Sequence, residues 1–519
     1  MKFNYIDEIC FLLGIIIAFC ASFFQAYKFA KIGSDHPVHV FLATVVRESN
    51  HRLFTRVPRL LNQSYCGANP LYLHWILSFV SPKHIKLLSY VLNPCMNALQ
   101  VLIVYSVCRG FPGISDVLSA KAGLVSLLFA LNPQFYHAFS ARNYGLSSRS
   151  IGIILLTIYV LFVFQARSVE SIFIYYVAII VTGCLMWGFN TFSQQAMILF
   201  SITTGIIFEK WDLLICFIVS TIVFIVIHPK YSISYIKYTF RFIVAYAKEL
   251  SAVFVLKIRY SIWRDIVCDI WIKLHNSVLE GLKYAYTNSL VIVLLLNPFA
   301  VFCIFIWFNV SQMPLMIRYF MQMALVGIIV FLLTSFRITR FLGEPERYVE
   351  FVTFFSTICT TWYLVEYTDF PFAYFIAYFV VVNILQICIV ILINRKISGK
   401  KEDFALAESI INNIFPAGSV RFCSNSEEYT KRMMMNLWQF VRLWTADQDY
   451  AGYKVREAFT QFPYVNKTPF EAALKQYRIN ICMLDKKNFS TIFEDDREMS
   501  SRLELLLETE NYILYRLSW

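Results

Sequence analysis

Side chains that could do chemistry are concentrated in three polar segments that lie between long apolar runs. These segments are Gly33–His39, Asn132–Ser150 and Arg337–Tyr348. An aspartate can take a proton from a hydroxyl group, and arginines hold phosphate oxygens through charge-assisted hydrogen bonds. The candidate residues are Asp35, His36, His39, Arg142, Arg149, Arg340, Glu344 and Arg347. Residue type alone thus allows proton transfer and anion binding in these segments.

Residue type alone leaves alternatives open at each segment. Asp35 could be a solvated loop residue beside the first apolar run. His36 and His39 could bind a divalent ion or act as bases, but two histidines without a third ligand are more often ordinary loop residues. The arginines could snorkel at a membrane surface, and the set around Glu344 could pair internally, hold a phosphate, or do both.

The composition places these segments in a membrane protein. The chain has 519 residues, of which 58% are hydrophobic and 15% charged, whereas soluble proteins are about 25% charged. Several apolar runs are long enough to cross a bilayer as helices, and they lack the alternation of a β-barrel strand. We therefore predict a polytopic α-helical protein with about eleven transmembrane helices. The first covers about residues 9–27, and the others centre near Asn97, Leu128, Thr157, Ile179, Ile202, Val219, Leu295, Val326, Thr357 and Phe379.

The same composition divides the chain into regions. Residues 1–395 form the predicted transmembrane domain, and residues 396–519 return to soluble composition and predict a small α/β domain with a core strand over Tyr477–Asp485. Residues 28–86 and 228–287 are amphipathic and basic, and they predict interfacial helices. The net charge of +12 lies mostly between apolar runs, so anionic headgroups or an anionic lipid substrate are the expected partners, and not nucleic acid.

Counting spans predicts which segments share a side of the membrane. With a cytoplasmic N-terminus, alternation places five chemically rich segments together on the non-cytoplasmic side, along with the domain after residue 396. The five are Lys28–Lys86, Pro133–Arg149, Asn190–Gln195, His228–Thr287 and Arg337–Tyr348. The eight Lys and Arg of the first segment oppose this orientation under the positive-inside rule, which is weaker for long loops.

The order of these segments resembles the GT-C glycosyltransferases, loosely over the whole membrane region. In that family an acid follows the first span, then come amphipathic helices and an Asn/Tyr-Pro-x-hydrophobic-x-His segment, here Asn69–His74. Asn132–Ser150 is similar to the polar loop after the third span, and Gly343–Tyr348 to late Gly-Glu-x-x-Arg-Tyr loops. The tail is similar to the outward α/β domains that some members carry.

The resemblance implies a glycosyltransferase that takes a sugar from a polyprenyl-phosphate donor to a glycan, lipid or protein acceptor. Asp35 would be the general base, because a phosphate leaves without an acid to protonate it, and the other candidates would bind substrate. The family often has two adjacent acids where this chain has Asp35 and His36, which puts a metal-dependent version in doubt. A divalent ion stays open, and no nucleotide cofactor is expected.

The implied location is a bacterial inner membrane, with the active site on the non-cytoplasmic side. Other functions stay open at this stage. A lipid-linked glycan polymerase or ligase would use Arg and His of late loops without a first-loop acid. A saccharide transporter or flippase would need charges in mid-span, which are nearly absent. A non-catalytic subunit that kept the fold is a further alternative.

Overall fold

The structure is a computed structural model of the chain. It describes the following residues: 5–29, 36–53, 61, 70–136, 145–167, 172–248, 266–278, 281, 284, 288–336, 338–398, 400–416, 419–426, 429–430, 433, 441–443, 464–486 and 501–519. Contacts divide it into two units that interleave along the chain. One comprises Met1–Lys31, Pro82–Ser232 and Ile258–Val390, and the other comprises Ile32–Ser81, Ile233–Lys257 and Ile391–Trp519.

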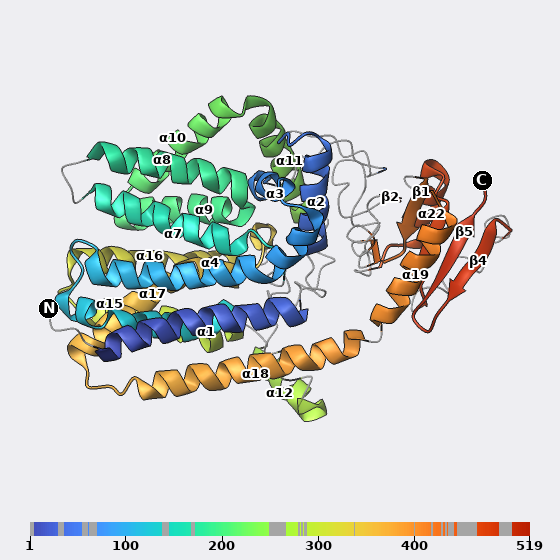
Figure 1. Ribbon diagram of the computed structural model, residues 1–519. Coiled ribbons are helices and arrows are strands. Elements are labelled where there is room, and N and C mark those ends of the chain that lie inside the picture. Colours follow the sequence, from blue (N-terminus) through green and yellow to red (C-terminus); the bar gives the residue numbers. More distant parts are fainter. Residues whose placement is uncertain are drawn as a thin grey trace. The chain divides into compact units, whose positions relative to one another are not determined.

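The first unit is a helix bundle in which helices run back and forth side by side (Figure 1). Its elements in chain order are α1 (Tyr5–Phe29), α4 (Pro82–Gly110), α5 (Asp116–Ala120), α6 (Ala122–Leu131), η2 (Pro133–Tyr136), α7 (Arg149–Ala166), α8 (Ile172–Phe189), α9 (Thr191–Phe208), α10 (Asp212–Ile227), α12 (Ile266–Asn276), α14 (Ser289–Leu296), α15 (Pro298–Asn309), α16 (Leu315–Thr334), η6 (Arg340–Leu342), α17 (Glu346–Tyr367) and most of α18 (Ala373–Ser398).

Five of the described helices are long and apolar enough to cross a membrane, and a bent pair makes up to six. The five cover Tyr5–Lys28, Leu87–Gly110, Arg149–Ala166, Thr191–Phe208 and Leu315–Thr334. The chain is therefore an integral membrane protein, but the expected count of about eleven is not reached by this criterion. The shortfall has physical causes: three further apolar helices are shorter than 18 residues (Phe173–Phe189, Asp212–Ile227 and Ala373–Ile389), α6 has ten residues, α14 and α15 meet at a 78° bend, and α17 begins with charged residues.

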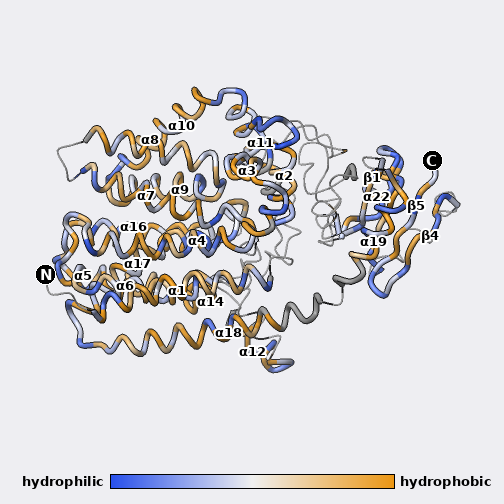
Figure 2. Tube along the Cα trace, viewed as in Figure 1, coloured by the Kyte–Doolittle hydropathy of each residue, from blue (hydrophilic) through white to orange (hydrophobic). Residues whose placement is uncertain are grey.

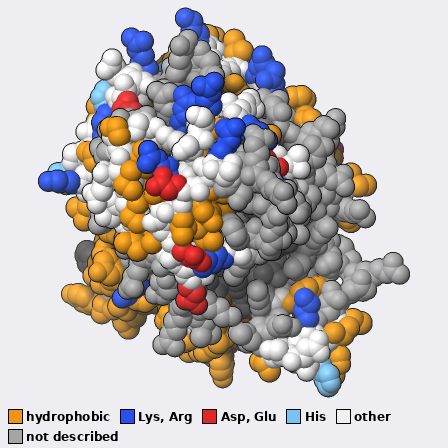
Figure 3. Space-filling model, turned by 90° about the vertical axis from the view of Figure 1, so that its right-hand side faces the viewer, with side chains coloured by type: hydrophobic (Ala, Val, Ile, Leu, Met, Phe, Trp, Pro, Cys, Tyr) orange, Lys and Arg blue, Asp and Glu red, His pale blue; other side chains and the backbone are white. Residues whose placement is uncertain are grey.

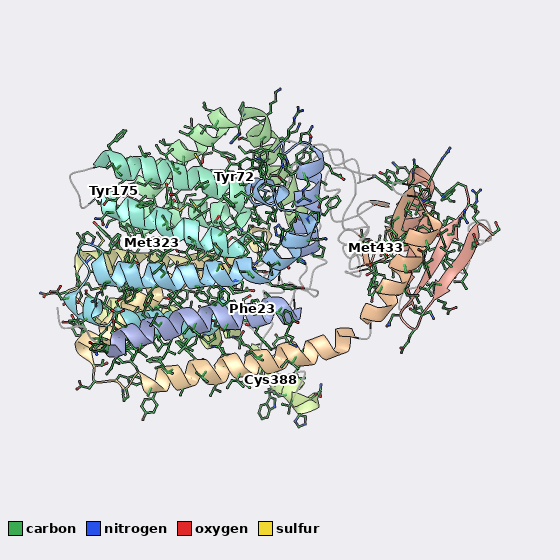
Figure 4. The ribbon with its side chains drawn as sticks, viewed as in Figure 1. Phe23, Tyr72, Tyr175, Met323, Cys388 and Met433 are labelled. Atoms are coloured by element: carbon green, nitrogen blue, oxygen red, sulfur yellow. The ribbon has the colours of Figure 1, made fainter. Side chains whose placement is uncertain are left out.

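The bundle core lies where α16 and α17 pack together and against their neighbours. α17 has almost every side chain buried, and Trp362 near its end is one of the largest fully buried residues. Figure 2 shows apolar residues along most of the bundle, as a lipid-embedded protein requires. In Figure 4 Met323 of α16 lies among bundle side chains, whereas Cys388 on α18 is exposed.

Polar chain segments gather at one end of this bundle, which we call the loop-rich end. It is the end where α1 finishes and where α4, α7, α9 and α17 begin (Figure 1). Hydrogen bonds join segments far apart in sequence there: Gln25 Nε2 donates to the Tyr136 carbonyl over 3.1 Å, and Asn93 Nδ2 to the Gly145 carbonyl over 2.7 Å. Counting spans predicts that five segments share one side of the membrane, and described parts of three of them lie at this end: Pro133–Arg149, Asn190–Gln195 and Arg337–Tyr348. Which side of the membrane the loop-rich end faces stays a prediction.

The opposite end of the bundle is fixed by a carboxylate on the first helix. Asp7 is buried, and its Oδ1 accepts hydrogen bonds from the backbone N–H groups of Gly123 over 2.9 Å and Leu124 over 3.2 Å. These are first-turn amides of α6, which have no partner within their own helix. The aspartate therefore caps α6 from α1 and holds the two helices in register.

Amphipathic helices occur where interfacial ones are expected. They are α2 (His36–Glu48), α3 (Tyr72–Ser78), α11 (Pro229–Lys248) and α12. α2 packs on α3, and the Arg47 guanidinium donates to the Ser78 carbonyl over 2.8 Å. The interfacial position of these helices and the domain boundary at residue 396 stay predictions.

The C-terminal segment forms a mixed sheet with helices beside it, as expected for a small α/β domain (Figure 1). The order is β2-β1-β3-β5-β4, with β1 parallel to β2 and β3 and the other pairs antiparallel. The elements are α19 (Lys400–Ile414), β1 (Val420–Ser424), β2 (Val441–Leu443), α22 (Lys467–Tyr477), β3 (Ile481–Asp485), β4 (Leu503–Glu508) and β5 (Tyr512–Leu517).

One expectation about the tail is wrong at its start. The predicted strand over Tyr477–Asp485 is a strand only from Ile481, where every residue is buried. Tyr477 ends α22, and Arg478 has a φ of 47°, in the left-handed region that often ends helices. The apolar pattern that predicts a strand therefore includes the last residue of the preceding helix.

Candidate functional site

The predicted site residues that the structure describes fall in two places, and the rest of the set lies outside the described residues. Asp35 and Arg142 are outside the described residues, as is the side chain of Arg340. His36 and His39 lie on α2, in the second unit. The remaining three lie at the loop-rich end of the bundle: Arg149, Glu344 and Arg347.

The α2–α3 pair contains a contact between two histidines. His39 Nδ1 and His74 Nε2 are 2.8 Å apart, and the rings stack at 5.0 Å between centroids. Burial lowers the pKa of His36 to about 4 with help from His39, and burial together with His39 lowers the pKa of His74 well below 6.5. His36 and His74 are thus neutral near pH 7.

The histidines do not form a metal centre within the described residues. There, no group of three or more His, Cys, Asp and Glu side chains could hold a metal ion. The 2.8 Å contact is a hydrogen bond in which one imidazole donates and the other accepts. The sequence does not single out His74 as a site residue, although it ends the Asn69–His74 segment.

The late loop holds a buried arginine, Arg347, at the start of α17. Arg347 is buried and makes an ion pair with Glu344, and its guanidinium carbon lies 4.2 Å from the centroid of the Phe192 ring. Gly343 has a φ of 97°, a conformation that favours glycine. The loop is tied to α9, because Gln195 Nε2 donates to the Leu342 carbonyl over 2.7 Å. Of the alternatives for this segment, internal pairing is present.

Arg149 is paired more deeply in the bundle. It opens α7, and its guanidinium contacts the carboxylate of Glu350 on α17, with side chains only 12% and 7% exposed. Glu350 is one helical turn after Arg347, so the two lie close together on α17. This ion pair thus links the N-terminal parts of α7 and α17 at the loop-rich end.

A polar cavity of about 40 Å³ adjoins this pair. Phenylalanines form its apolar walls, and Phe129 meets Phe135 edge to face at 4.6 Å. Its polar walls come from α1, α4, η2, α7 and α17, and they comprise Ser22, Gln25, Asn93, Asn97, Gln100, Gln134, Arg149, Ser150, Glu350 and Thr353. Four helices and a 3-10 turn therefore converge on one space with polar walls.

The fold is similar to that of solved membrane enzymes. A crystal structure of the Archaeoglobus fulgidus oligosaccharyltransferase, in complex with Zn and sulfate, matches 98% of this chain and 73% of that one, at 11% identity and a TM-score of 0.51. The chain has a GT-C fold. This GT-C fold is the one that the order of the polar segments implies.

Two further matches are weaker. Oligosaccharyltransferase AglB from Archaeoglobus fulgidus, in complex with an inhibitory peptide and a dolichol-phosphate, matches 93% of this chain and 70% of that one, at 11% identity and a TM-score of 0.47. ArnT from Cupriavidus metallidurans, bound to undecaprenyl phosphate, matches 97% of both chains at 10% identity and a TM-score of 0.42. No family model and no curated protein matches the sequence.

Sequence reasoning missed the amide side chains and Glu350 of this GT-C bundle. A signal for the amides was present, because Asn93, Asn97 and Gln100 recur at helical spacing within an apolar run. Polar residues inside a membrane span are costly and point to function or to internal hydrogen bonding. Glu350 carries a similar signal, because it is an acid near the start of the apolar run centred near Thr357, but its partner Arg149 is remote in sequence and could not be predicted.

Proposed function

We propose that the chain is a membrane glycosyltransferase that moves a sugar from a polyprenyl-phosphate-linked donor to a glycan, lipid or protein acceptor at the non-cytoplasmic face. The observation that carries the proposal is the convergence of Arg149, Glu344 and Arg347 at one end of a GT-C bundle. A lipid-linked substrate can reach such an end from the membrane. The glycosyltransferase class also agrees with the oligosaccharyltransferase whose fold is similar.

The proposed reaction is a displacement at the anomeric carbon of the donor sugar. Asp35 takes the proton of an acceptor hydroxyl, and the acceptor oxygen forms a bond to that carbon. The carbon–oxygen bond to the phosphate breaks, and its electron pair leaves with the phosphate. Cationic side chains stabilise this leaving group, and Arg340 and Arg347 are proposed for that role. His36, His39 and Arg142 are proposed to line the substrate path.

The proposal is tested with purified full-length protein in lipid nanodiscs. The wild type is assayed against a panel of undecaprenyl- and dolichyl-phosphate sugars, with release of the polyprenyl phosphate as the readout. In the Asp35→Asn variant the rate with the preferred donor should fall by about 10²–10⁴-fold, the typical loss of a general base. Asparagine serves as well as aspartate before a helix, so α2, which begins at His36, should be preserved.

The matched control is Glu48→Gln, which neutralises the other acid of the same segment. Glu48 is exposed at the end of α2, so its loss should leave the rate near the wild-type value. Equal activity of Asp35→Asn and the wild type would remove Asp35 as the base. Failure of every lipid donor would remove the glycosyltransferase proposal itself.

A further inference from the structure

The cavity beside Arg149 and Glu350 is more polar than the bundle around it requires. Some of its amides bond to a hydroxyl group or to each other: Asn97 Nδ2 donates to Ser22 Oγ over 2.7 Å, and Gln100 Nε2 to Asn97 Oδ1 over 3.4 Å. Burying an amide among apolar helices costs free energy unless its hydrogen bonds are made. The amides of this cluster therefore require a hydrogen-bonding partner inside the cavity.

Gln134 is the residue that shows this need most directly. Its side chain lines the cavity, the residue is 4% exposed, and neither Nε2 nor Oε1 has a hydrogen-bond partner among the described residues. Within the same described part, Glu350 Oε1 also has none. Buried polar atoms are nearly always satisfied, so water or a ligand is expected to satisfy these. The missing partner must donate to Glu350 and both donate to and accept from Gln134.

The chemistry of the walls selects the kind of ligand. A phosphate oxyanion only accepts hydrogen bonds, so the acceptors Gln134 Oε1 and Glu350 Oε1 disfavour it. The positive charge of Arg149 is already balanced by Glu350, which leaves no net charge for an ion. A hydroxyl group both donates and accepts, and the rings of Phe129 and Phe354 offer apolar walls to C–H groups.

The size of the cavity fits a few hydroxyl groups. A water molecule needs about 10–15 Å³ of cavity volume. The cavity volume of about 40 Å³ therefore has room for roughly three waters or for as many hydroxyl groups. The cavity also lies one turn of α17 beyond Arg347, the proposed phosphate cation. A sugar joined to a phosphate at Arg347 would therefore direct hydroxyl groups towards Gln134 and Glu350.

We propose that this cavity is the subsite for the hydroxyl groups of an uncharged donor sugar, with Gln134 and Glu350 as the residues that recognise them. The inference rests on the proposed function, since it assigns the sugar end of the same donor. It predicts that a neutral hexose is preferred over an amino sugar or a uronic acid. The charges of Arg149 and Glu350 already neutralise each other, so a charged group on the sugar would have no opposite charge to pair with.

The test measures binding without turnover. Dissociation constants of the purified full-length protein in nanodiscs are compared for undecaprenyl phosphate, its mannose, glucose and galactose derivatives, and its amino-arabinose derivative. At least one neutral hexose lipid should bind ten or more times tighter than undecaprenyl phosphate alone. Gln134→Met, which keeps the size and removes the polar atoms, should abolish this gain and leave the affinity for undecaprenyl phosphate unchanged.

Two further variants make the result decisive. Gln134→Glu keeps the acceptors and loses the donor, so it should reduce the gain and not abolish it. Gln322→Met removes another buried amide, on α16 and outside the cavity, and should keep the full gain. Equal affinities for sugar-bearing and sugar-free lipid in the wild type, or a full gain in Gln134→Met, would mean that the cavity holds water only. No binding of either lipid would overturn the proposed donor and this subsite together.

Discussion

The guanidinium of Arg149 and the carboxylate of Glu350, which are 201 residues apart in sequence, form a buried ion pair between α7 and α17. Removing two charges from water is costly, and the cost is recovered only while both partners are present. A buried pair of this kind is therefore more sensitive to the loss of one partner than to the loss of both.

The first prediction follows from this asymmetry. Arg149→Met or Glu350→Leu alone should destabilise the protein by about 3–5 kcal/mol, whereas the double variant should lie closer to the wild type. Thermal unfolding of the purified protein in detergent gives the order of the four proteins. The control is Lys486→Met, which breaks a more exposed pair with Glu508 and should cost about 1 kcal/mol or less. A double variant that loses the sum of both single losses would contradict the pairing.

Arg347 has a different neighbour and a different expected phenotype. Arg347→Ala should raise the KM for a lipid-phosphate donor by about tenfold to a hundredfold, since a charge-assisted contact is worth about 1.5–3 kcal/mol. Glu344→Gln releases Arg347 from its internal pair and should keep or lower that KM. Arg318→Ala removes an exposed cation on α16 and serves as the control. If Arg347 only pairs with Glu344 and does not contact the donor, the KM should not change in Arg347→Ala or in Glu344→Gln. That result would contradict the proposed phosphate contact.

Packing at the opposite end supplies a stability prediction that is independent of function. A Cβ at Gly123 would lie 1.8 Å from the Asp7 carbonyl oxygen, so Gly123→Ala must push α1 away from α6. We expect a loss of about 1–3 kcal/mol or more, as for other overpacked sites. Gly110→Ala is the matched control, because a Cβ there meets nothing within 4 Å. Equal unfolding temperatures for the two variants would refute the close approach of the helices.

The membrane character and the α/β tail could be predicted from sequence because both depend on local composition. Apolar runs such as Tyr5–Lys28 and the short apolar run before Asp485 are visible within a short window. The predicted number of spans is not confirmed, because the short lengths of several apolar helices and the bend between α14 and α15 depend on how neighbouring helices pack, which no short sequence window shows.

The candidate site could be predicted only in part, and the reason is again the range of the interactions. The late loop around Arg347 contains its own partner, Glu344, three residues away. The pairs Arg149–Glu350 and His39–His74 join separate elements, so no local pattern reveals them. Asp35 stays a prediction from its position in the sequence.

The histidines of the α2–α3 pair predict a loss of stability in acid. Burial lowers the pKa of His36 to about 4, while in an unfolded chain it would be about 6.5. The unfolded state then binds more protons between these values, so the helix pair is unaffected above about pH 6.5 and loses stability as the pH falls towards 4. The loss is about 1.4 kcal/mol per pH unit for each such group, and His74 adds to it.

Hydrogen exchange of the α2 and α3 peptides, corrected for its intrinsic pH dependence, measures this loss between pH 7.5 and 5. Protection should fall in the wild type and change less in the variant with both His36→Gln and His74→Gln. His84→Gln alters an exposed histidine on α4 and should behave as the wild type. Protection that stays constant down to pH 5 would mean that these imidazoles accept protons without opening the pair.

The last prediction concerns which side of the membrane the loop-rich end faces. α16 is one of the apolar helices long enough to span, so the positions beyond its two ends lie on opposite sides. Ile338 is 87% exposed beyond its C-terminus, and Ser311 is exposed before its N-terminus. In a background without the native cysteines, Ile338→Cys should react with an impermeant maleimide in intact cells, and Ser311→Cys only after permeabilisation.

Two physical arguments oppose each other in this experiment. The eight Lys and Arg of residues 28–86 favour a cytoplasmic position for that segment. The opposing argument is that a long basic segment is a weak topology signal and that an anionic lipid substrate requires cations beside it. The face in Figure 3 carries more Lys and Arg than Asp and Glu side chains, which both arguments accommodate. The reverse labelling pattern would place Arg149 and Arg347 on the cytoplasmic side. A lipid-phosphate donor would then have to be used on the leaflet where such lipids meet soluble cytoplasmic acceptors.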